Sequence, residues 1–565
     1  MPFLRFMTFL VVATCLFPVQ QSLAGPNLID LVQERLRNRI ETAGRPTRLA
    51  VGSEAIYASA SLPRFYERRG YVPAWINELG PLNLIESLMH SLSTAYREGL
   101  VPQDYHLQRI QSTLKKIGEN PGEGLSFNPG RLVDLDLLLS DAFLIYASHC
   151  LSGQVNPDTF DPEWYANRRG ADVGQALEAA LSSSRIAETL RQFLPSQTGY
   201  WKLRKALADY RKIAQNGGWK KTAQGPALKS GSSGDRVADL YARLANEPEF
   251  IPANASEAVF DASLEEKVRI FQHRHGLDED GVAGQATLSA LNVSASERVQ
   301  QISINMERWR WLPRDLGANH ILVNLPSFNL VLFEEDEIVM HMRVIVGKSY
   351  RRTPVFSDTM RYLVLCPYWH VPPGIAVKDK LPLIKKNPEY LRNQNMRVFQ
   401  GWGAQAKELD PTSITWDSLS AENFPYRLRQ DSGPENALGR IKFMFPNRFH
   451  VYMHDTPSRE LFAKSTRTFS SGCIRIEKPL ELAEYLLQDD PHWNKPAIQA
   501  QIARNIEKTV TLLKPVNVHM QYWTAFVDQD GLVHFRNDIY GRDKRLHQAL
   551  LLPPPTSTTL PIISD

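Results

Sequence analysis

The spacing of apolar residues changes along this chain of 565 residues, and that change restricts its fold more than any single motif. From about residue 28 to 225, apolar residues recur at three- and four-residue steps, which predicts packed helices. From about residue 298 to 372 they alternate in strand fashion, with FEEDEIV as a hairpin turn. The length also exceeds a single ordinary core. The sequence therefore predicts a multidomain α+β protein.

Changes in composition and the positions of glycine and proline mark the expected boundaries. The predicted parts are a signal peptide over 1–24, a helical scaffold over 25–225, a small helical module over 226–295, a mostly-β domain over 298–545 and a flexible tail over 546–565. A mixed segment over 374–440 interrupts the β domain. An insertion of this length is typical of a lid or a binding loop, so we expect it to cap the site.

The first 24 residues have the pattern of a secretory signal, with one arginine, an apolar run and small residues before Gly25. The run is too short to span a bilayer comfortably, which favours cleavage over a retained anchor, and no later segment resembles a membrane span. Cys15 would leave with the signal, and Cys150, Cys366 and Cys473 would remain. An odd number of cysteines in an oxidising compartment leaves at least one thiol free. The net charge of +4 gives no support for nucleic-acid binding.

The stretch HVYMHDTPSRELFAKSTRTFSSGCIRI, residues 450–476, gathers side chains suited to acyl transfer. Strand alternation along FHVYMH places His450, Tyr452 and His454 on one face. Cys473 follows His454 by 19 residues, a gap that lets a loop return beside the strand. A histidine can deprotonate the thiol, and successive amides at the Gly472 turn can bind an oxyanion. On spacing alone, a buried structural cysteine at a glycine turn is an equally good interpretation.

Residues 226–293 resemble the small peptidoglycan-binding module of many wall enzymes. The resemblance rests on the order in which Gln272, Asp280-Gly281 and Thr287-Leu288 follow one another. This resemblance implies localisation to the wall. The alternative is a three-helix domain that binds nothing.

The segments HDTPSRELF, SSGCIRI, KFMFPNRFHVYMH and GPENALGRIKF resemble the catalytic motif of the YkuD-like L,D-transpeptidases. The domain order is similar to that of the large periplasmic branch, which has a helical scaffold, a wall-binding module and a capping insertion. Further matching segments extend the resemblance over nearly the whole mature chain, namely RGYVPAW, GLVPQDYH, ERWRWLP, PYWHVPPGIA and YWTAFVD.

The resemblance implies that Cys473 is the nucleophile, His454 its base, and the Gly472 and Cys473 amides the oxyanion hole, supported by Tyr452. It implies that Arg475 holds a substrate carboxylate or orders the loop. The further substrate-binding residues would be Ser470, Ser471, Trp369 and His450, of which His450 is the competing base. Many relatives carry histidine where this chain has Ser471, which leaves open the group that orients the thiolate.

The implied activity is that of a periplasmic, wall-associated peptidoglycan L,D-transpeptidase that is acylated by carbapenems. An acyl-enzyme would form on a tetrapeptide stem with release of D-alanine, and transfer to a diamino-acid amine would give a 3→3 cross-link. The implied partners are donor and acceptor stem peptides, glycan and wall synthases. No cofactor or metal is expected, since neither H-E-x-x-H nor paired C-x-x-C spacing occurs. Three alternatives remain: an L,D-carboxypeptidase or hydrolase, an enzyme that attaches lipoproteins, and a non-enzymatic wall-binding scaffold.

Overall fold

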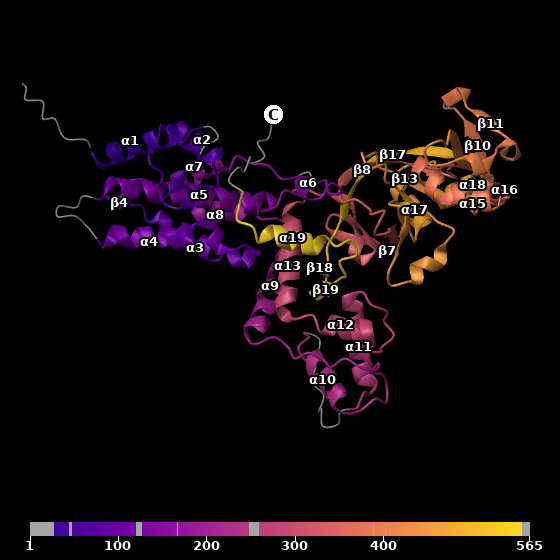
Figure 1. Cartoon of the computed structure of the whole chain (residues 1–565), viewed down its shortest axis with the longest axis horizontal. Helices are drawn as coiled ribbons and strands as arrows, with labels where there is room; N and C mark the ends of the chain where they lie inside the picture. Colours follow the sequence, from indigo (N-terminus) through magenta and orange to yellow (C-terminus); the bar gives the residue numbers. More distant parts are fainter. Residues whose placement is uncertain are drawn as a thin grey trace, which may run out of the picture.

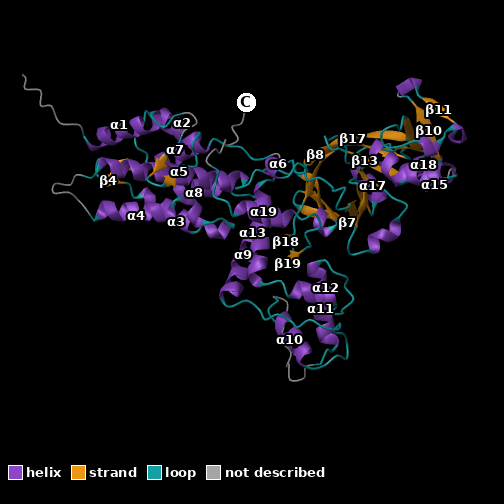
Figure 2. Cartoon of the chain, in the orientation of Figure 1, coloured by secondary structure: helices purple, strands orange, loops and turns teal. Residues whose placement is uncertain are grey.

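The computed structural model describes residues 27–44, 48–119, 127–165, 168–247, 259–387, 389–401 and 403–555. The predicted signal peptide over 1–24 lies outside these residues, as do residues 556–565 of the predicted tail. Figure 1 shows a helical domain at one end, a β-rich domain toward the other, and a small helical module that projects from the middle. The secondary structure in Figure 2 confirms the predicted multidomain fold, helical first and mostly β in the catalytic domain.

The helical domain is built around one long buried helix, α5 (Pro129–Ser152). Asn128 caps its N-terminus by accepting hydrogen bonds from the Gly130 and Arg131 amides. Among the described residues, α5 alone is long and apolar enough for a membrane span, but its apolar window is entirely buried inside the protein, as in the core helix of a globular domain. Around it lie α1 (Leu28–Glu41), α2 (Ser61–Arg68), α3 (Leu84–Ser93), α4 (Leu107–Gly118), α7 (Val173–Ser183), α8 (Ile186–Gln192) and the two-residue pairs β1 (Ala50–Val51) with β2 (Glu54–Ala55) and β3 (Ile76–Asn77) with β4 (Gly80–Pro81). The short helix α6 (Pro157–Phe160) leads toward the β-rich domain, and Phe160 packs against that domain's core.

The projecting module consists of α10 (Asp235–Leu244), α11 (Ala262–His275) and α12 (Gln285–Leu291) around its own apolar core. The motif residue Gln272 is buried, and its amide nitrogen donates to Asp280 Oδ1 at 2.8 Å. Its carbonyl oxygen accepts from the Gly281 amide at 2.9 Å. Gln272 therefore ties the Asp280-Gly281 turn to α11, which is a structural reason for these residue types.

The strand pattern predicted from residue 298 is wrong at its start, because residues Ala295–Arg310 form helix α13. A reciprocal capping box between Ser294 and Glu297 begins this helix. The apolar face of α13 packs against α9 (Thr198–Gln215) through Ile302, Met306 and Trp309. The predicted boundary between 295 and 298 thus falls inside a helix that joins the scaffold to the catalytic domain.

The catalytic domain contains a nine-stranded sheet in the order β15-β7-β16-β14-β13-β8-β17-β5-β6, and the additional pairing of β6 with β7 closes it on itself. Two adjacent residues with left-handed backbone, Glu335 and Asp336, make the predicted FEEDEIV hairpin turn. The strands are β5 (Asn319–Asn324), β6 (Asn329–Glu334), β7 (Glu337–Gly347), β8 (Ser357–Leu365), β13 (Ile441–Met444), β14 (Met453–His454), β15 (Thr468–Ser470), β16 (Ile474–Ile476) and β17 (Lys508–Gln521).

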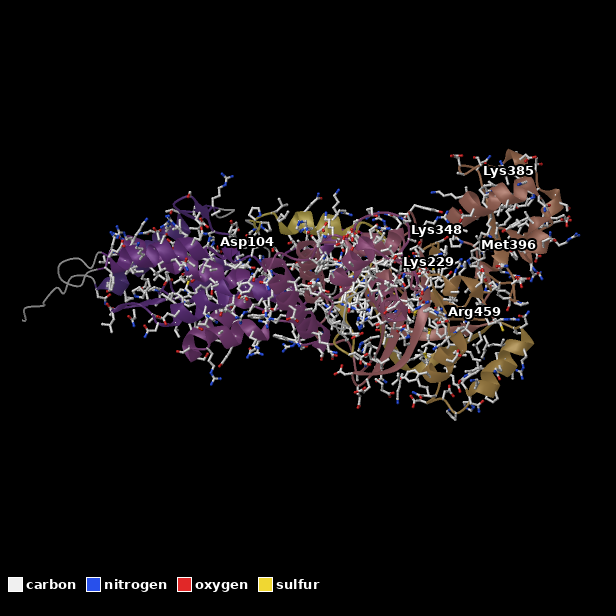
Figure 3. The ribbon with its side chains drawn as sticks, turned by 90° about the horizontal axis from the view of Figure 1, so that it is seen from below. Asp104, Lys229, Lys348, Lys385, Met396 and Arg459 are labelled. Atoms are coloured by element: carbon white, nitrogen blue, oxygen red, sulfur yellow. The ribbon has the colours of Figure 1, made fainter. Side chains whose placement is uncertain are left out.

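The insertion has a separate four-stranded sheet in the order β11-β10-β12-β9 and its own apolar core. Trp369 lies in that core, so the insertion begins before the predicted residue 374. Figure 3 shows Lys385 and Met396 of the insertion far from Asp104 of the helical domain. Its elements are β9 (Trp369–His370), α14 (Pro373–Ile375), α15 (Leu381–Lys386), α16 (Tyr390–Asn393), β10 (Met396–Gln400), β11 (Lys407–Leu409) and β12 (Tyr426–Gln430).

After the catalytic turn the chain forms α17 (Pro479–Leu486) and α18 (Lys495–Arg504), and later the hairpin of β18 (Ala525–Val527) with β19 (Val533–Phe535). It ends in α19 (Arg542–Leu550). The tail predicted from residue 546 therefore begins too early, because Leu546 is fully buried and anchors the last helix.

Candidate active site

Cys473 directly precedes β16, which lies beside the strand that carries the candidate histidine. Strand β16 pairs in parallel with β14, which sets Arg475 opposite His454. The Ile474 amide donates to the Tyr452 carbonyl at 3.1 Å. The 18 residues between His454 and Cys473 therefore return the chain to the same strand, as the sequence predicts.

The turn before Cys473 is held together by Ser470. The buried Ser470 hydroxyl accepts a hydrogen bond from the Gly472 amide at 3.1 Å and donates to the Cys473 carbonyl at 2.5 Å. Gly472 has a φ of +119°, a backbone conformation that favours glycine. Among the described residues, the Cys473 amide has no protein acceptor. The Gly472 N–H predicted for the oxyanion hole is thus already bound to Ser470, whereas the Cys473 N–H is available to an oxyanion.

Tyr452 joins the thiol to a lysine. Its phenol and its backbone amide are hydrogen-bonding groups for the Cys473 sulfur. Lys442 Nζ lies 3.9 Å from the centroid of the Tyr452 ring. Burial and the neighbouring Cys473 sulfur raise the pKa of the Tyr452 phenol, so it stays protonated and able to donate.

His454 is buried and neutral. Its Nδ1 lies 2.5 Å from the Asp455 carbonyl oxygen, so Nδ1–H donates there in the neutral ring, and the Leu438 carbonyl is a second backbone acceptor beside the imidazole. Burial, together with the nearby cations Arg475 and Lys442, lowers the pKa of His454 to about 3. No hydrogen bond joins His454 to the Cys473 thiol in the described part of the chain. The resting site therefore has a neutral imidazole near a neutral thiol.

The Cys473 thiol is half-buried, and that burial raises its pKa. Hydrogen bonds from Tyr452 and the positive charges of Lys442 and Arg475 act in the opposite direction. Burial prevails in the resting state, and the cations become more important when negative charge forms on sulfur.

Lys442 is a site residue that the sequence analysis missed. It pairs with His454 across β13 and β14, and Arg475 pairs with His454 across β14 and β16. Neither cation forms an ion pair in the part of the chain described, and Arg475 Nε is buried without an acceptor. Lys442 lies in the segment GRIKF of the family motif, but its position opposite His454 could be recognised only from the strand register.

Three further predicted binding residues have different surroundings. His450 is exposed, with a φ of +55° in a turn held by Asn447, so the strand predicted along FHVYMH is confined to Met453–His454. Trp369 is buried in the core of the insertion, with Lys380 over its ring. Ser471 is exposed at the turn, and its hydroxyl accepts a hydrogen bond from Arg351.

Three regions of the chain match known protein families. Residues 60–207 match a scaffold domain, residues 233–291 a putative peptidoglycan binding domain, and residues 318–497 an L,D-transpeptidase catalytic domain, YkuD. A putative L,D-transpeptidase of Haemophilus influenzae is 35% identical over 254 residues, which are 45% of this chain and 50% of that protein. The chain thus spans about half the length of this curated relative.

Two solved L,D-transpeptidase structures are also similar to parts of the chain. The structure from Xylanimonas cellulosilytica has 14% identity and a TM-score of 0.17, and covers 53% of this chain and 99% of its own. The structure from Stackebrandtia nassauensis has 11% identity and a TM-score of 0.21, and covers 53% and 96%. The family matches, together with the H. influenzae relative, show that this chain contains a YkuD L,D-transpeptidase catalytic domain and a peptidoglycan-binding domain.

Proposed function

We propose that this protein is a peptidoglycan L,D-transpeptidase with Cys473 as its nucleophile. The observation that carries the proposal is a half-buried thiol beside an amide N–H, a phenol and two cations, inside the region that matches the catalytic domain, where neither the N–H nor the cations have an acceptor or an ion-pair partner among the residues the structure describes. The thiol sulfur attacks the carbonyl between the diamino acid and the terminal D-alanine of a tetrapeptide stem. A thioester forms, the C–N bond breaks, and D-alanine leaves as an amine that takes up the proton.

Transfer completes the reaction. The side-chain amine of a neighbouring stem attacks the thioester, loses a proton and restores the Cys473 thiol, which gives a 3→3 cross-link. The tetrahedral intermediate of each half-reaction carries an oxyanion, for which the Cys473 N–H and the Tyr452 phenol are the available donors. The putative peptidoglycan binding domain over residues 233–291 supports the cell wall as the site of action and the periplasm as the compartment.

Substrate binding provides a route to activation. A stem carboxylate is the anion that suits Arg475 and Lys442, since both are cations without an ion pair in the described part of the chain. A bound carboxylate offsets the positive charges that depress the pKa of His454. His454 Nε2 then becomes a stronger base and takes the thiol proton as the sulfur attacks. Proton removal is thereby linked to the presence of a donor stem.

Incubation of purified protein with tetrapeptide muropeptides tests the proposal. We expect dimers with 3→3 links and released D-alanine, identified by mass, and no product from the Cys473→Ala variant. Cys366→Ala is the matched control, because Cys366 is a buried cysteine of the same domain outside the site. Trimmed monomers alone would show that water is the acceptor, and dimers formed by Cys473→Ala would refute the assigned nucleophile.

A further inference from the structure

A buried threonine hydroxyl lies beneath the catalytic turn. Thr353 is fully buried, and its Oγ1 donates to the Gly472 carbonyl at 2.9 Å. The same oxygen accepts from the Gly347 amide at 2.9 Å. The threonine therefore uses both hydrogen-bonding functions of its side chain to connect the end of β7 to the turn that precedes Cys473.

This contact orients the amide that the reaction uses. The Gly472 carbonyl and the Cys473 N–H belong to one peptide unit, and in a planar trans peptide these two groups point in opposite directions. A hydrogen bond that holds the carbonyl on the Thr353 side consequently directs the Cys473 N–H to the other side. That N–H has no protein acceptor among the described residues, as a donor kept for an oxyanion would require.

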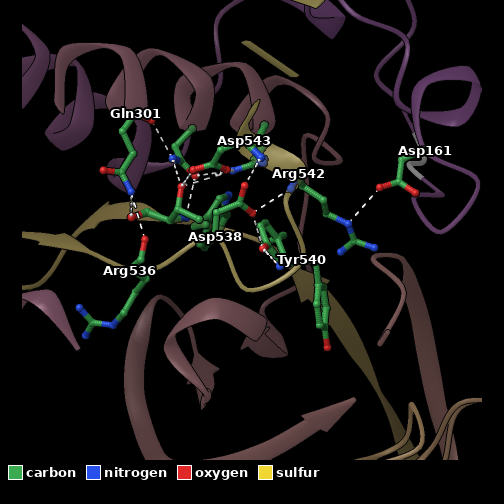
Figure 4. Close-up of polar contacts among 12 residues, drawn as sticks. Asp161, Gln301, Arg536, Asp538, Tyr540, Arg542 and Asp543 are labelled. Atoms are coloured by element: carbon green, nitrogen blue, oxygen red, sulfur yellow. Dashed lines mark hydrogen bonds and ion pairs between the residues drawn. The ribbon is translucent and has the colours of Figure 1, made fainter. Parts of the chain in front are cut away.

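Tyr540 holds Thr353 in place. Its phenol donates to the Gly347 carbonyl at 2.7 Å and accepts from the Thr353 amide at 3.3 Å. The Tyr540 amide in turn donates to the Tyr522 hydroxyl at 2.8 Å, and Tyr522 donates to Asp538 at 2.6 Å. Figure 4 shows Tyr540 and Asp538 within this polar network at the start of α19.

The scaffold supports the same network from the other side. The buried guanidinium of Arg542 donates to Asp161 at 3.0 Å, a contact drawn in Figure 4. The neighbouring Glu163 carbonyl accepts from the Val355 amide at 2.8 Å, two residues beyond Thr353. The segment that contains Thr353 is therefore clamped between the helical domain and the C-terminal segment.

We propose that Thr353, held by Tyr540, is a positioning residue that aims the Cys473 N–H at the oxyanion. This inference deepens the proposed function and rests on it. It assigns no direct contact with substrate to either residue. Two reactions of the same thiol should therefore respond differently. Acylation passes through an oxyanion and depends on the Cys473 N–H, whereas alkylation by iodoacetamide forms no oxyanion and does not depend on that N–H.

The test compares these two reactions on the full chain by intact-protein mass. Wild type, Thr353→Val, Thr353→Ser and Tyr540→Phe are treated with a carbapenem, which acylates by ring opening, or with iodoacetamide. In Thr353→Val we expect acylation to slow by about 10²-fold, the usual effect of losing one oxyanion donor. We expect alkylation to change less than about threefold, since the thiol and its charged neighbours are retained. Thr353→Ser should recover most of the acylation rate, and Tyr540→Phe should fall between the two.

Thermal unfolding of each variant separates an effect on the turn from general loss of structure. The inference is overturned if Thr353→Val acylates within threefold of wild type, or if acylation and alkylation fall by the same factor. A wild type that forms no carbapenem adduct would overturn the proposed function, and the inference with it. A wild type that is acylated, with Thr353→Val equally fast, would overturn the inference alone.

Discussion

Arg351 donates a hydrogen bond of 3.0 Å to the hydroxyl of Ser471, at the position where the family resemblance leads one to expect a histidine. The same guanidinium forms an ion pair with Asp379, in which Nη2 lies 2.8 Å from Oδ1. Asp379 belongs to the insertion, and Ser471 belongs to the catalytic turn. One arginine thus connects the two, and the position of the insertion is coupled to the loop that carries the nucleophile.

Removal of this connection should loosen the insertion before it harms the fold. For Arg351→Ala we expect faster amide hydrogen exchange over residues 376–386 and acyl transfer slower by roughly tenfold, because misplacement of a binding element reduces the rate without abolishing it. Arg392→Ala is the matched control, since Arg392 forms an exposed ion pair with Glu389 inside the same insertion. Equal exchange in the two variants would contradict the coupling.

The free enzyme should show a thiol of low reactivity at neutral pH. Because burial raises the pKa of Cys473, the thiolate fraction is small at pH 7 and rises with pH, so alkylation by iodoacetamide should increase through a single inflection above the ordinary range of a cysteine thiol. His454, with its pKa lowered to about 3, remains neutral and adds no inflection near its ordinary value of 6.5. An alkylation rate that is already constant between about pH 5 and 8 would reveal a thiolate–imidazolium pair and contradict this description.

Arg475 and Lys442 should distinguish a stem with a free carboxylate from an amidated one. We expect wild type to acylate on a tetrapeptide with a terminal carboxylate at least about tenfold faster than on its amide, since a charge-assisted hydrogen bond is lost. In Arg475→Gln the preference should shrink through an increase in KM, because the carboxylate loses a charged partner, while the pKa of His454 is depressed less once the Arg475 charge is removed. Lys478→Gln serves as the control, because Lys478 is a cation of the same domain that donates to the His341 carbonyl. An unchanged preference in Arg475→Gln would place the carboxylate elsewhere.

The sequence predicted the parts of this molecule that local pattern determines. Helical periodicity located the scaffold, and strand alternation located the β6–β7 hairpin. It failed where a local signal overrides periodicity: the capping box at Ser294 begins a helix where a strand was expected, and the Asn447 side chain turns the chain before β14.

The sequence likewise predicted some residues of the candidate site and missed others. Cys473 and His454 follow from one short stretch, and the structure brings their strands together. The use of the Gly472 N–H by Ser470 and the presence of Lys442 beside Tyr452 depend on hydrogen bonds and strand register. Arg351 lies 120 positions from Ser471, so no spacing rule connects them.

A substitution at Gly472 tests the effect of backbone conformation without a steric clash. A Cβ added there would lie 3.6 Å from the Arg352 carbonyl oxygen, so there is room for a methyl group. The φ of +119° is nevertheless a conformation that other residues rarely adopt, at a cost of about 1–3 kcal/mol. In Gly472→Ala we expect the turn to relax away from Ser470 and Thr353, which moves the Cys473 amide.

Acylation of Gly472→Ala by a carbapenem should therefore slow by about 10²-fold while alkylation by iodoacetamide is retained. Gly374→Ala is the matched control, because Gly374 has open space around its Cβ position and no left-handed φ. Both variants are measured by intact-protein mass, with thermal unfolding alongside. If Gly472→Ala acylates as fast as wild type, the turn does not need its present backbone conformation, and the Cys473 N–H is not the donor that stabilises the oxyanion.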